Sequence, residues 1–210
     1  MSGLFVPGWG ASASLYRAGM PPGWTALDPP TFRCSGGELA SYRRWLADEL
    51  GRRRPPVALA GHSMGAALVL LAASELPGRI EKLILVSPAG LPLDKPLPAS
   101  AGTFVGQVAR GCYPLREIYR CLAHAAAAPR AALRLARVVH DLDLSRELEP
   151  IRAHRIPCTV IACTGDRLTT AAHCRRLASL LDARYRELDA REGHIWMVVD
   201  PGRLAEELNA

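Results

Sequence analysis

Residues 57–65 read VALAGHSMG, and an apolar segment of small residues, 66–73, follows at once. The run before Gly61 is typical of a buried strand, and the segment after Gly65 is typical of a buried helix. A chain that turns from strand to helix within so few residues strains the backbone of the central residue, and small neighbours tolerate that strain. In the pattern GxSxG the turn presents the serine hydroxyl at the end of the strand, so Ser63 is the candidate nucleophile.

Short apolar runs on both sides of this turn predict a parallel sheet. Besides 57–60, the runs are residues 4–6, 24–27, 83–87, 159–163 and 185–188. Helix-compatible sequence follows the first run at about 12–19, and apolar residues fall at helical spacing at 38–50, whereas residues 31–37 are expected to form a polar loop. Alternation of strands and helices is typical of an α/β fold with right-handed crossovers. We therefore expect about six mostly parallel strands flanked by helices.

Residues 91–149 interrupt this alternation. A proline-rich entry leads into three helical stretches, at about 103–110, 115–127 and 130–142, with no convincing strand. An all-helical insertion after the serine turn is expected to lie across the strand ends as a cap, with its apolar face lining a pocket. The predicted organisation is an α/β core of residues 1–90 and 150–210 with a helical cap of residues 91–149.

The chain has 210 residues, 49% hydrophobic and 22% charged, which fits one globular domain. No apolar run approaches the roughly 20 residues of a membrane span. The first residues lack a basic region and their apolar run ends at Pro7, so we expect no secretory signal and a cytoplasmic location.

Cysteine spacing and charge argue against two classes of function. None of the six cysteines has CxxC spacing, and the adjacent His173 and Cys174 would point different ways on a helix, so no metal site is expected. The net charge of +6 comes mostly from arginines spread along the chain, without a known nucleic-acid motif. Nucleic acid is therefore not an expected partner.

A serine hydroxyl needs a base to take its proton, usually a histidine oriented by a buried carboxylate. Asp166 follows the predicted strand 159–163, and His194 follows the last predicted strand. Both would lie at the carboxyl ends of parallel strands, where sites in such sheets collect. The chain order Ser63, Asp166, His194 is the one that accompanies a GxSxG turn.

These motifs together resemble the α/β-hydrolase superfamily of esterases and lipases. The resemblance runs from PGWG at residues 7–10 through GHSMG at 61–65 and TGDR at 164–167 to GHIWM at 193–197. It implies Ser63 as nucleophile, His194 as general base and acid, and Asp166 as the orienting carboxylate. It also implies an oxyanion hole formed by the backbone amides of Trp9 and Met64, and no metal or organic cofactor.

The chain departs from the family pattern in two places. Pro7-Gly8 stands where the family usually has His-Gly, which removes a histidine that buttresses the oxyanion loop. The chain also begins at the strand that leads into this loop, so the first two antiparallel strands of the family are missing. Glu192 and Asp94 are the alternatives to Asp166 as the acid, and His62 is expected to be structural.

The first functional hypothesis is a serine hydrolase that cleaves a carboxylic ester through an acyl-enzyme. An acyltransferase could use the same residues, and a non-catalytic binding protein could retain the pocket. A further alternative is an ester carried by an acidic acyl carrier, which would dock on Arg130, Arg134 and Arg137, at positions i, i+4 and i+7 of a predicted helix. It rests on similarity to carrier-dependent esterases whose oxyanion loop also reads GWG.

Overall fold

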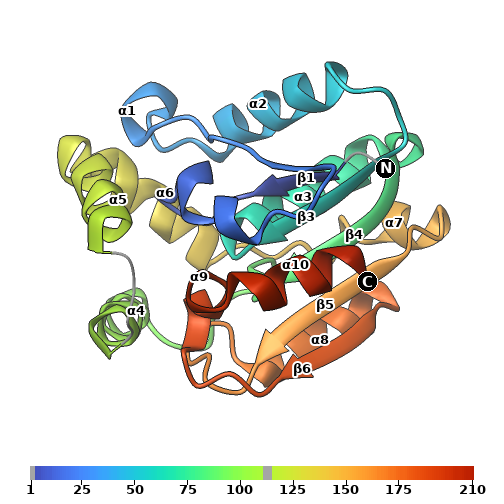
Figure 1. Cartoon of the computed structure of the whole chain (residues 1–210). Helices are drawn as coiled ribbons and strands as arrows, with labels where there is room; N and C mark the ends of the chain where they lie inside the picture. Colours follow the sequence, from blue (N-terminus) through green and yellow to red (C-terminus); the bar gives the residue numbers. More distant parts are fainter. Residues whose placement is uncertain (1–2, 111–114) are drawn as a thin grey trace.

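The computed structural model of the chain describes residues 3–110 and 115–210 (Figure 1). Six strands form one sheet in the order β2-β1-β3-β4-β5-β6, and every neighbouring pair is parallel. They are β1 (Gly3–Val6), β2 (Trp24–Ala26), β3 (Val57–His62), β4 (Ile80–Val86), β5 (Cys158–Cys163) and β6 (Arg184–Leu188). The expected fold is confirmed, and the sheet is entirely parallel where a mostly parallel one was predicted.

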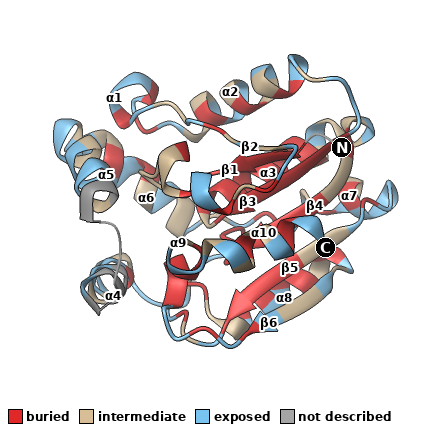
Figure 2. Ribbon diagram, viewed as in Figure 1, coloured by how far each residue is buried: buried red, intermediate tan, exposed pale blue. Residues whose placement is uncertain are grey.

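Helices cover both faces of the sheet because successive strand residues point to opposite sides. In β4, Leu83 and Leu85 join one hydrophobic cluster, whereas Ile84 and Val86 join another. The first cluster is covered by α2 (Leu39–Gly51), α3 (Met64–Glu75), α7 (Glu149–Ala153) and α8 (Ala171–Leu181), and the second by α9 (Trp196–Val199) and α10 (Pro201–Asn209). Figure 2 shows the central strands β1, β3, β4 and β5 largely buried between these layers. Burial on both faces explains why these central strands are mostly apolar runs.

Three of the helices between β4 and β5 are α4 (Leu97–Arg110), α5 (Leu115–Ala127) and α6 (Pro129–His140), which precede α7 in the chain. In Figure 1, α4 and α5 lie beyond the arrowheads of the strands, at the carboxyl end of the sheet. Ala132 and Leu135 of α6 are buried in the first hydrophobic cluster. The end of the sheet near these helices is the end whose strands lead to Ser63 and Asp166 (Figure 1).

Two segments differ from expectation. Residues 12–19, predicted as one helix, form two short 3-10 turns, η1 (Ala13–Leu15) and η2 (Arg17–Gly19). The Ala13 amide donates to the carboxylate of Asp28 at 2.8 Å, which ties η1 to the loop after β2. Residues 31–37, predicted as a loop, contain α1 (Phe32–Ser35). Burial of Phe32 against Trp9, a contact across the fold, stabilises this single turn.

Candidate active site

Ser63 joins β3 to α3 with φ 53° and ψ −117°, a conformation that costs a residue with a side chain about 1–3 kcal/mol. A Cβ at Gly61 would lie 2.5 Å from the backbone of Gly65, and one at Gly65 would lie 2.1 Å from the carbonyl oxygen of Val6. The two glycines thus allow β3, α3 and the loop after β1 to meet. The Ser63 amide donates to the carbonyl of Val86 at 3.0 Å, which anchors the turn to β4.

A cavity of about 300 Å³ opens beside Ser63, and Ser63 and His194 both line it. Helices α4, α5 and α6 supply much of its wall through Leu97, Ala101, Val105, Ile118, Leu122, Ala136 and Val139. Ligand sites with mainly apolar walls and few polar groups bind apolar ligands in a defined orientation. This cavity is therefore suited to a molecule with an apolar part whose reacting group lies at Ser63.

His194 and Asp166 meet in the interior behind this cavity. His194 follows β6 in the turn η4 (Gly193–Ile195), and its Nδ1 lies 2.8 Å from Oδ2 of Asp166, with both side chains buried. Burial raises the pKa of Asp166, but the nearby His194 and the hydrogen bonds to the carboxylate outweigh this effect and hold the pKa below its usual value. Asp166 is therefore a stable anion that can orient His194.

Thr169 is a site residue that the sequence did not indicate. Its hydroxyl donates to Oδ2 of Asp166 at 2.8 Å and lies 3.3 Å from Nδ1 of His194. The backbone amides of Leu168 and Thr169 donate to the other carboxylate oxygen, at 2.8 and 3.1 Å. An aspartate with a threonine three residues later is the available local signal, since such side chains often close turns of this kind.

The two predicted oxyanion amides belong to segments that touch. Met64 is the first residue of α3, where helical amides have no partner within the helix. Trp9 lines the cavity, and the close approach of Gly65 to Val6 brings its loop over the start of α3. The Trp9 indole donates to the carbonyl of Ala132 in α6 at 3.2 Å. Contacts of this kind hold the loop although Pro7 replaces the usual histidine.

The predicted docking arginines lie away from the cavity. Arg130, Arg134 and Arg137 are exposed on α6, and none of them lines the cavity beside Ser63. Arg134 forms an ion pair of 3.1 Å with Glu38 at the start of α2. Because these arginines lie outside the cavity, they would not contact a group that reacts at Ser63.

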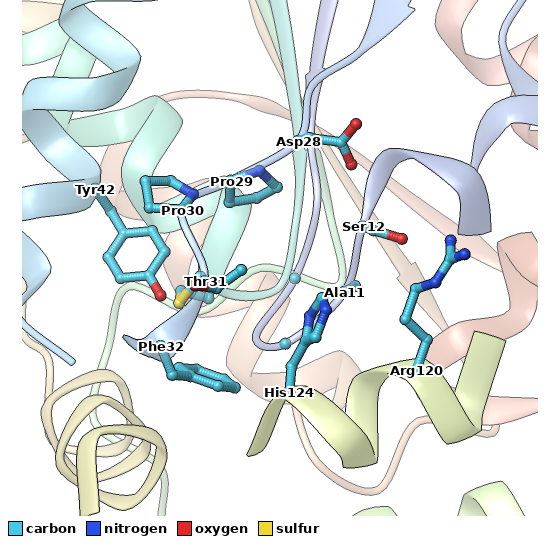
Figure 3. Close-up of a pocket in the computed structure, with 13 residues that line it drawn as sticks. Ala11, Ser12, Asp28, Pro29, Pro30, Thr31, Phe32, Tyr42, Arg120 and His124 are labelled. Carbon is cyan, nitrogen blue, oxygen red and sulfur yellow. The ribbon is translucent and has the colours of Figure 1, made fainter. Parts of the chain in front are cut away.

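A second cavity, of about 330 Å³, lies next to the first and shares Gly8 and Ala11 with it. Figure 3 shows Arg120 and His124 extending into it from α5, with Asp28 on the opposite side. The Arg120 guanidinium donates to the hydroxyl of Ser14 at 3.1 Å. This cavity is more polar than the one beside Ser63, and neither Ser63 nor His194 lines it.

Two other kinds of feature are absent from the described residues. No group of three or more histidine, cysteine, aspartate or glutamate side chains among them could hold a metal ion. Within 3–110 and 115–210, no helix is both long enough and apolar enough to cross a membrane.

Comparison with known proteins identifies the family of the chain and solved structures with a similar fold. A family model described as the alpha/beta hydrolase family matches residues 4–207. No curated protein sequence matches the chain.

Among solved structures, the fold is similar to that of an esterase from Exiguobacterium antarcticum, at 13% identity and a TM-score of 0.78, covering 100% of this chain and 91% of that one. A bromoperoxidase from Bacillus anthracis gives 17% identity and a TM-score of 0.81, covering 99% and 90%. A lipase-esterase related protein from Clostridium acetobutylicum gives 18% identity and a TM-score of 0.75, covering 99% and 93%. At such identities the likeness concerns the fold alone, which hosts many chemistries.

Proposed function

Because the chain belongs to the alpha/beta hydrolase family, we propose that it is a serine hydrolase that cleaves a carboxylic ester with an apolar part. One observation carries the proposal. Ser63, in a strained turn, shares an apolar cavity with His194, whose ring is hydrogen-bonded to the buried carboxylate of Asp166. A nucleophile, a base and an orienting acid are what acyl transfer through serine needs.

In the first half of the reaction, Ser63 Oγ attacks the ester carbonyl carbon. The hydrogen on Nδ1 of His194 is directed at Asp166, so Nε2 has the lone pair that accepts the serine proton. The carbonyl oxygen becomes an oxyanion, which the amides of Trp9 and Met64 stabilise. Two such donors typically contribute several kcal/mol to transition-state stabilisation.

Collapse of this intermediate breaks the bond between the acyl carbon and the alcohol oxygen. His194 gives its proton to the leaving alcohol, and the acyl group stays on Ser63. Water, deprotonated by His194, then attacks the acyl carbon. The bond between that carbon and Ser63 Oγ breaks, His194 returns the proton to Ser63, and the carboxylic acid leaves. Asp166 stabilises the imidazolium formed in each half, and the protein needs no metal or organic cofactor for these steps.

We propose further that residues 91–149 form a cap on a core of residues 1–90 and 150–210. Helices α4 to α6 supply much of the apolar wall of the cavity beside Ser63, which supports this division. A volume near 300 Å³ lies at the lower end of the range for small-molecule sites. An ester of moderate size therefore fits better than a long lipid chain bound in full.

Two alternatives use the same site. An acyltransferase would pass the acyl group to an alcohol or thiol, which requires that the acceptor reach Ser63 more readily than water does. A non-catalytic binding protein would keep the cavity without turnover. We also propose a cytoplasmic location.

The distribution of charge favours one narrower substrate, an ester linked to an acidic acyl carrier. Residues 97–140 contain six arginines and one glutamate, so they hold five of the six net positive charges of the chain. The exposed Arg130 and Arg137 lie on one helix of this segment. Electrostatic complementarity would speed encounter with an acidic partner and orient it on α6.

The test is a panel of p-nitrophenyl esters of increasing acyl length, with the wild type and Ser63→Ala. We expect Ser63→Ala to lower kcat by at least about 10³-fold, because only binding and oxyanion stabilisation remain. Ser179→Ala, on the exposed side of α8, is the matched control and should keep wild-type rates. A fluorophosphonate should label the wild type at Ser63, and an adduct elsewhere would contradict the assignment.

A further inference from the structure

His62 contacts a tyrosine hydroxyl and a backbone carbonyl, two groups to which the proposed mechanism gives no role. It is the last residue of β3, directly before Ser63, and it is buried. Its Nδ1 lies 2.8 Å from the hydroxyl of Tyr16, and its Nε2 lies 2.9 Å from the backbone oxygen of His194. The GxSxG pattern leaves this position open, so the contacts belong to this chain and not to the motif.

The direction of each hydrogen bond follows from chemistry. A carbonyl oxygen can only accept, so Nε2 of His62 carries the hydrogen and donates to His194. Burial, assisted by the nearby His194, lowers the pKa of His62 to about 3, so the ring is neutral at physiological pH. A neutral ring has one N–H, and Nδ1 must therefore accept from Tyr16. Burial raises the pKa of Tyr16, which keeps the phenol protonated for this role.

The same hydroxyl reaches the oxyanion loop. The amide of Gly8 donates to the Tyr16 hydroxyl at 3.4 Å. A Cβ at Gly8 would lie 2.9 Å from Nδ1 of His62, so the loop passes directly against the ring. Gly8, Tyr16, His62 and the backbone of His194 thus form one hydrogen-bond chain, in which each member donates to the next.

This hydrogen-bond chain connects the three segments that must act together. Gly8 precedes the proposed oxyanion residue Trp9, His62 precedes the nucleophile Ser63, and His194 is the proposed base. Asp166 holds the ring of His194, whereas His62 holds its backbone, with the two imidazole rings 4.7 Å apart. The buried ring of His62 therefore fixes the distance between His194 and the oxyanion loop.

We infer that Tyr16 and His62 are positioning residues of the hydrolytic reaction. The Tyr16 hydroxyl orients the neutral ring of His62. This ring in turn holds the backbone of His194 at the position from which its side chain reaches Ser63, and it keeps the oxyanion loop at a fixed place relative to both residues. The inference rests on the proposed ester hydrolysis. A displacement of about 1 Å in such a constellation can lower the rate on the order of 10²-fold, so loss of one oriented contact should be measurable.

The first experiment measures the kinetics of the variant Tyr16→Phe. This change keeps the ring that packs on Phe5, with centroids 4.8 Å apart, and removes the oxygen that Gly8 and His62 use. We expect kcat for a p-nitrophenyl ester to fall about tenfold or more and KM to stay within about twofold, because the apolar walls are intact. Tyr42→Phe is the matched control, since Tyr42 is equally buried but bonds to Ser35. A kcat of Tyr16→Phe within twofold of the control would overturn the inference.

A double-mutant cycle separates this role from general packing. His62→Gln retains an amide N–H that can reach His194, but it breaks the oriented contact with Tyr16. In the His62→Gln background, Tyr16→Phe should cost less than about twofold in kcat, because the two residues act as a unit. Losses that multiply as independent effects would overturn the inference.

The third measurement needs no substrate. Nitrogen NMR of labelled histidine should find His62 neutral, with its hydrogen on Nε2, from pH 8 down to pH 5. Titration of His62 in this range, or a hydrogen on Nδ1, would overturn the hydrogen-bond chain. Absence of ester turnover by the wild type would instead count against the proposed function, and the NMR result would still stand.

Discussion

Asp166 and His194 lie 2.8 Å apart at the ends of the neighbouring strands β5 and β6, with their side chains removed from solvent. A buried charge is costly unless hydrogen bonds satisfy it. Asp166 meets this condition through two backbone amides, one hydroxyl and one imidazole. Because the carboxylate is so fully occupied, its removal should act on the base and leave the substrate cavity unchanged.

The first prediction concerns the charge of Asp166. Asp166→Asn keeps the shape but should lower kcat on the order of 10⁴-fold, since His194 loses the partner that orients it and stabilises its imidazolium. KM for p-nitrophenyl esters should change little. Asp189→Asn, an exposed carboxylate bonded to Thr164, is the control and should be active. If Asp166→Asn kept more than about a tenth of the wild-type kcat, the acid would have to be Glu192 or Asp94.

Thr169→Val tests whether the hydroxyl that donates to Asp166 stabilises this carboxylate. Valine matches the shape of threonine but cannot donate to Asp166, so the buried anion loses one of its four hydrogen bonds. We expect the free energy of unfolding in urea to fall by about 1–3 kcal/mol, and kcat to fall several-fold. Thr159→Val, half-buried on β5, should change neither quantity by a comparable amount. Unchanged stability and rate in Thr169→Val would mean that the two amides and His194 hold Asp166 without help from the hydroxyl.

Ile118→Phe tests whether the cavity beside Ser63 receives the acyl chain. Ile118 lines the cavity from α5, and a larger ring there should occupy volume that a long chain needs. We expect kcat/KM for a p-nitrophenyl decanoate to fall at least about tenfold, and that for the acetate to fall less than about threefold. Leu133→Phe, 45% exposed on α6, is the control. Equal losses for both esters would place the acyl chain elsewhere.

The carrier hypothesis predicts an effect of charge. Arg130→Glu combined with Arg137→Glu should raise KM for a carrier-linked ester by about tenfold, and added salt should raise the wild-type KM for it. Small p-nitrophenyl esters should react at wild-type rates, because neither arginine lines the cavity. Reversal of Arg52 and Arg54, in the exposed loop before β3 at the opposite end of the sheet, is the control. Similar KM values for all variants would exclude docking on α6.

Local sequence was sufficient for the strands and for the turn at Ser63. Apolar runs predicted all six strands, and the signal was clearest in β1, β3, β4 and β5, because burial between two layers of helices leaves these central strands without a fully polar face. The weak run at 185–188 became β6 because pairing with β5 completes the edge of the sheet. The single helix predicted at 12–19 was wrong. Ala13 is bonded to Asp28 and Tyr16 is buried in the core, and the local sequence pattern does not reveal such distant contacts.

The sequence by itself determined the order of strands and helices, the strained turn at Ser63 and the positions of Asp166 and His194 at strand ends. These features depend on residues within a few positions of one another, and parallel strands bring their carboxyl ends to one edge. Only the tertiary structure decided that Thr169 serves Asp166 and that Tyr16 reaches His62 across 46 positions of the chain. A hydrogen bond requires two atoms within about 3 Å in a definite orientation, and for distant residues packing alone sets that distance.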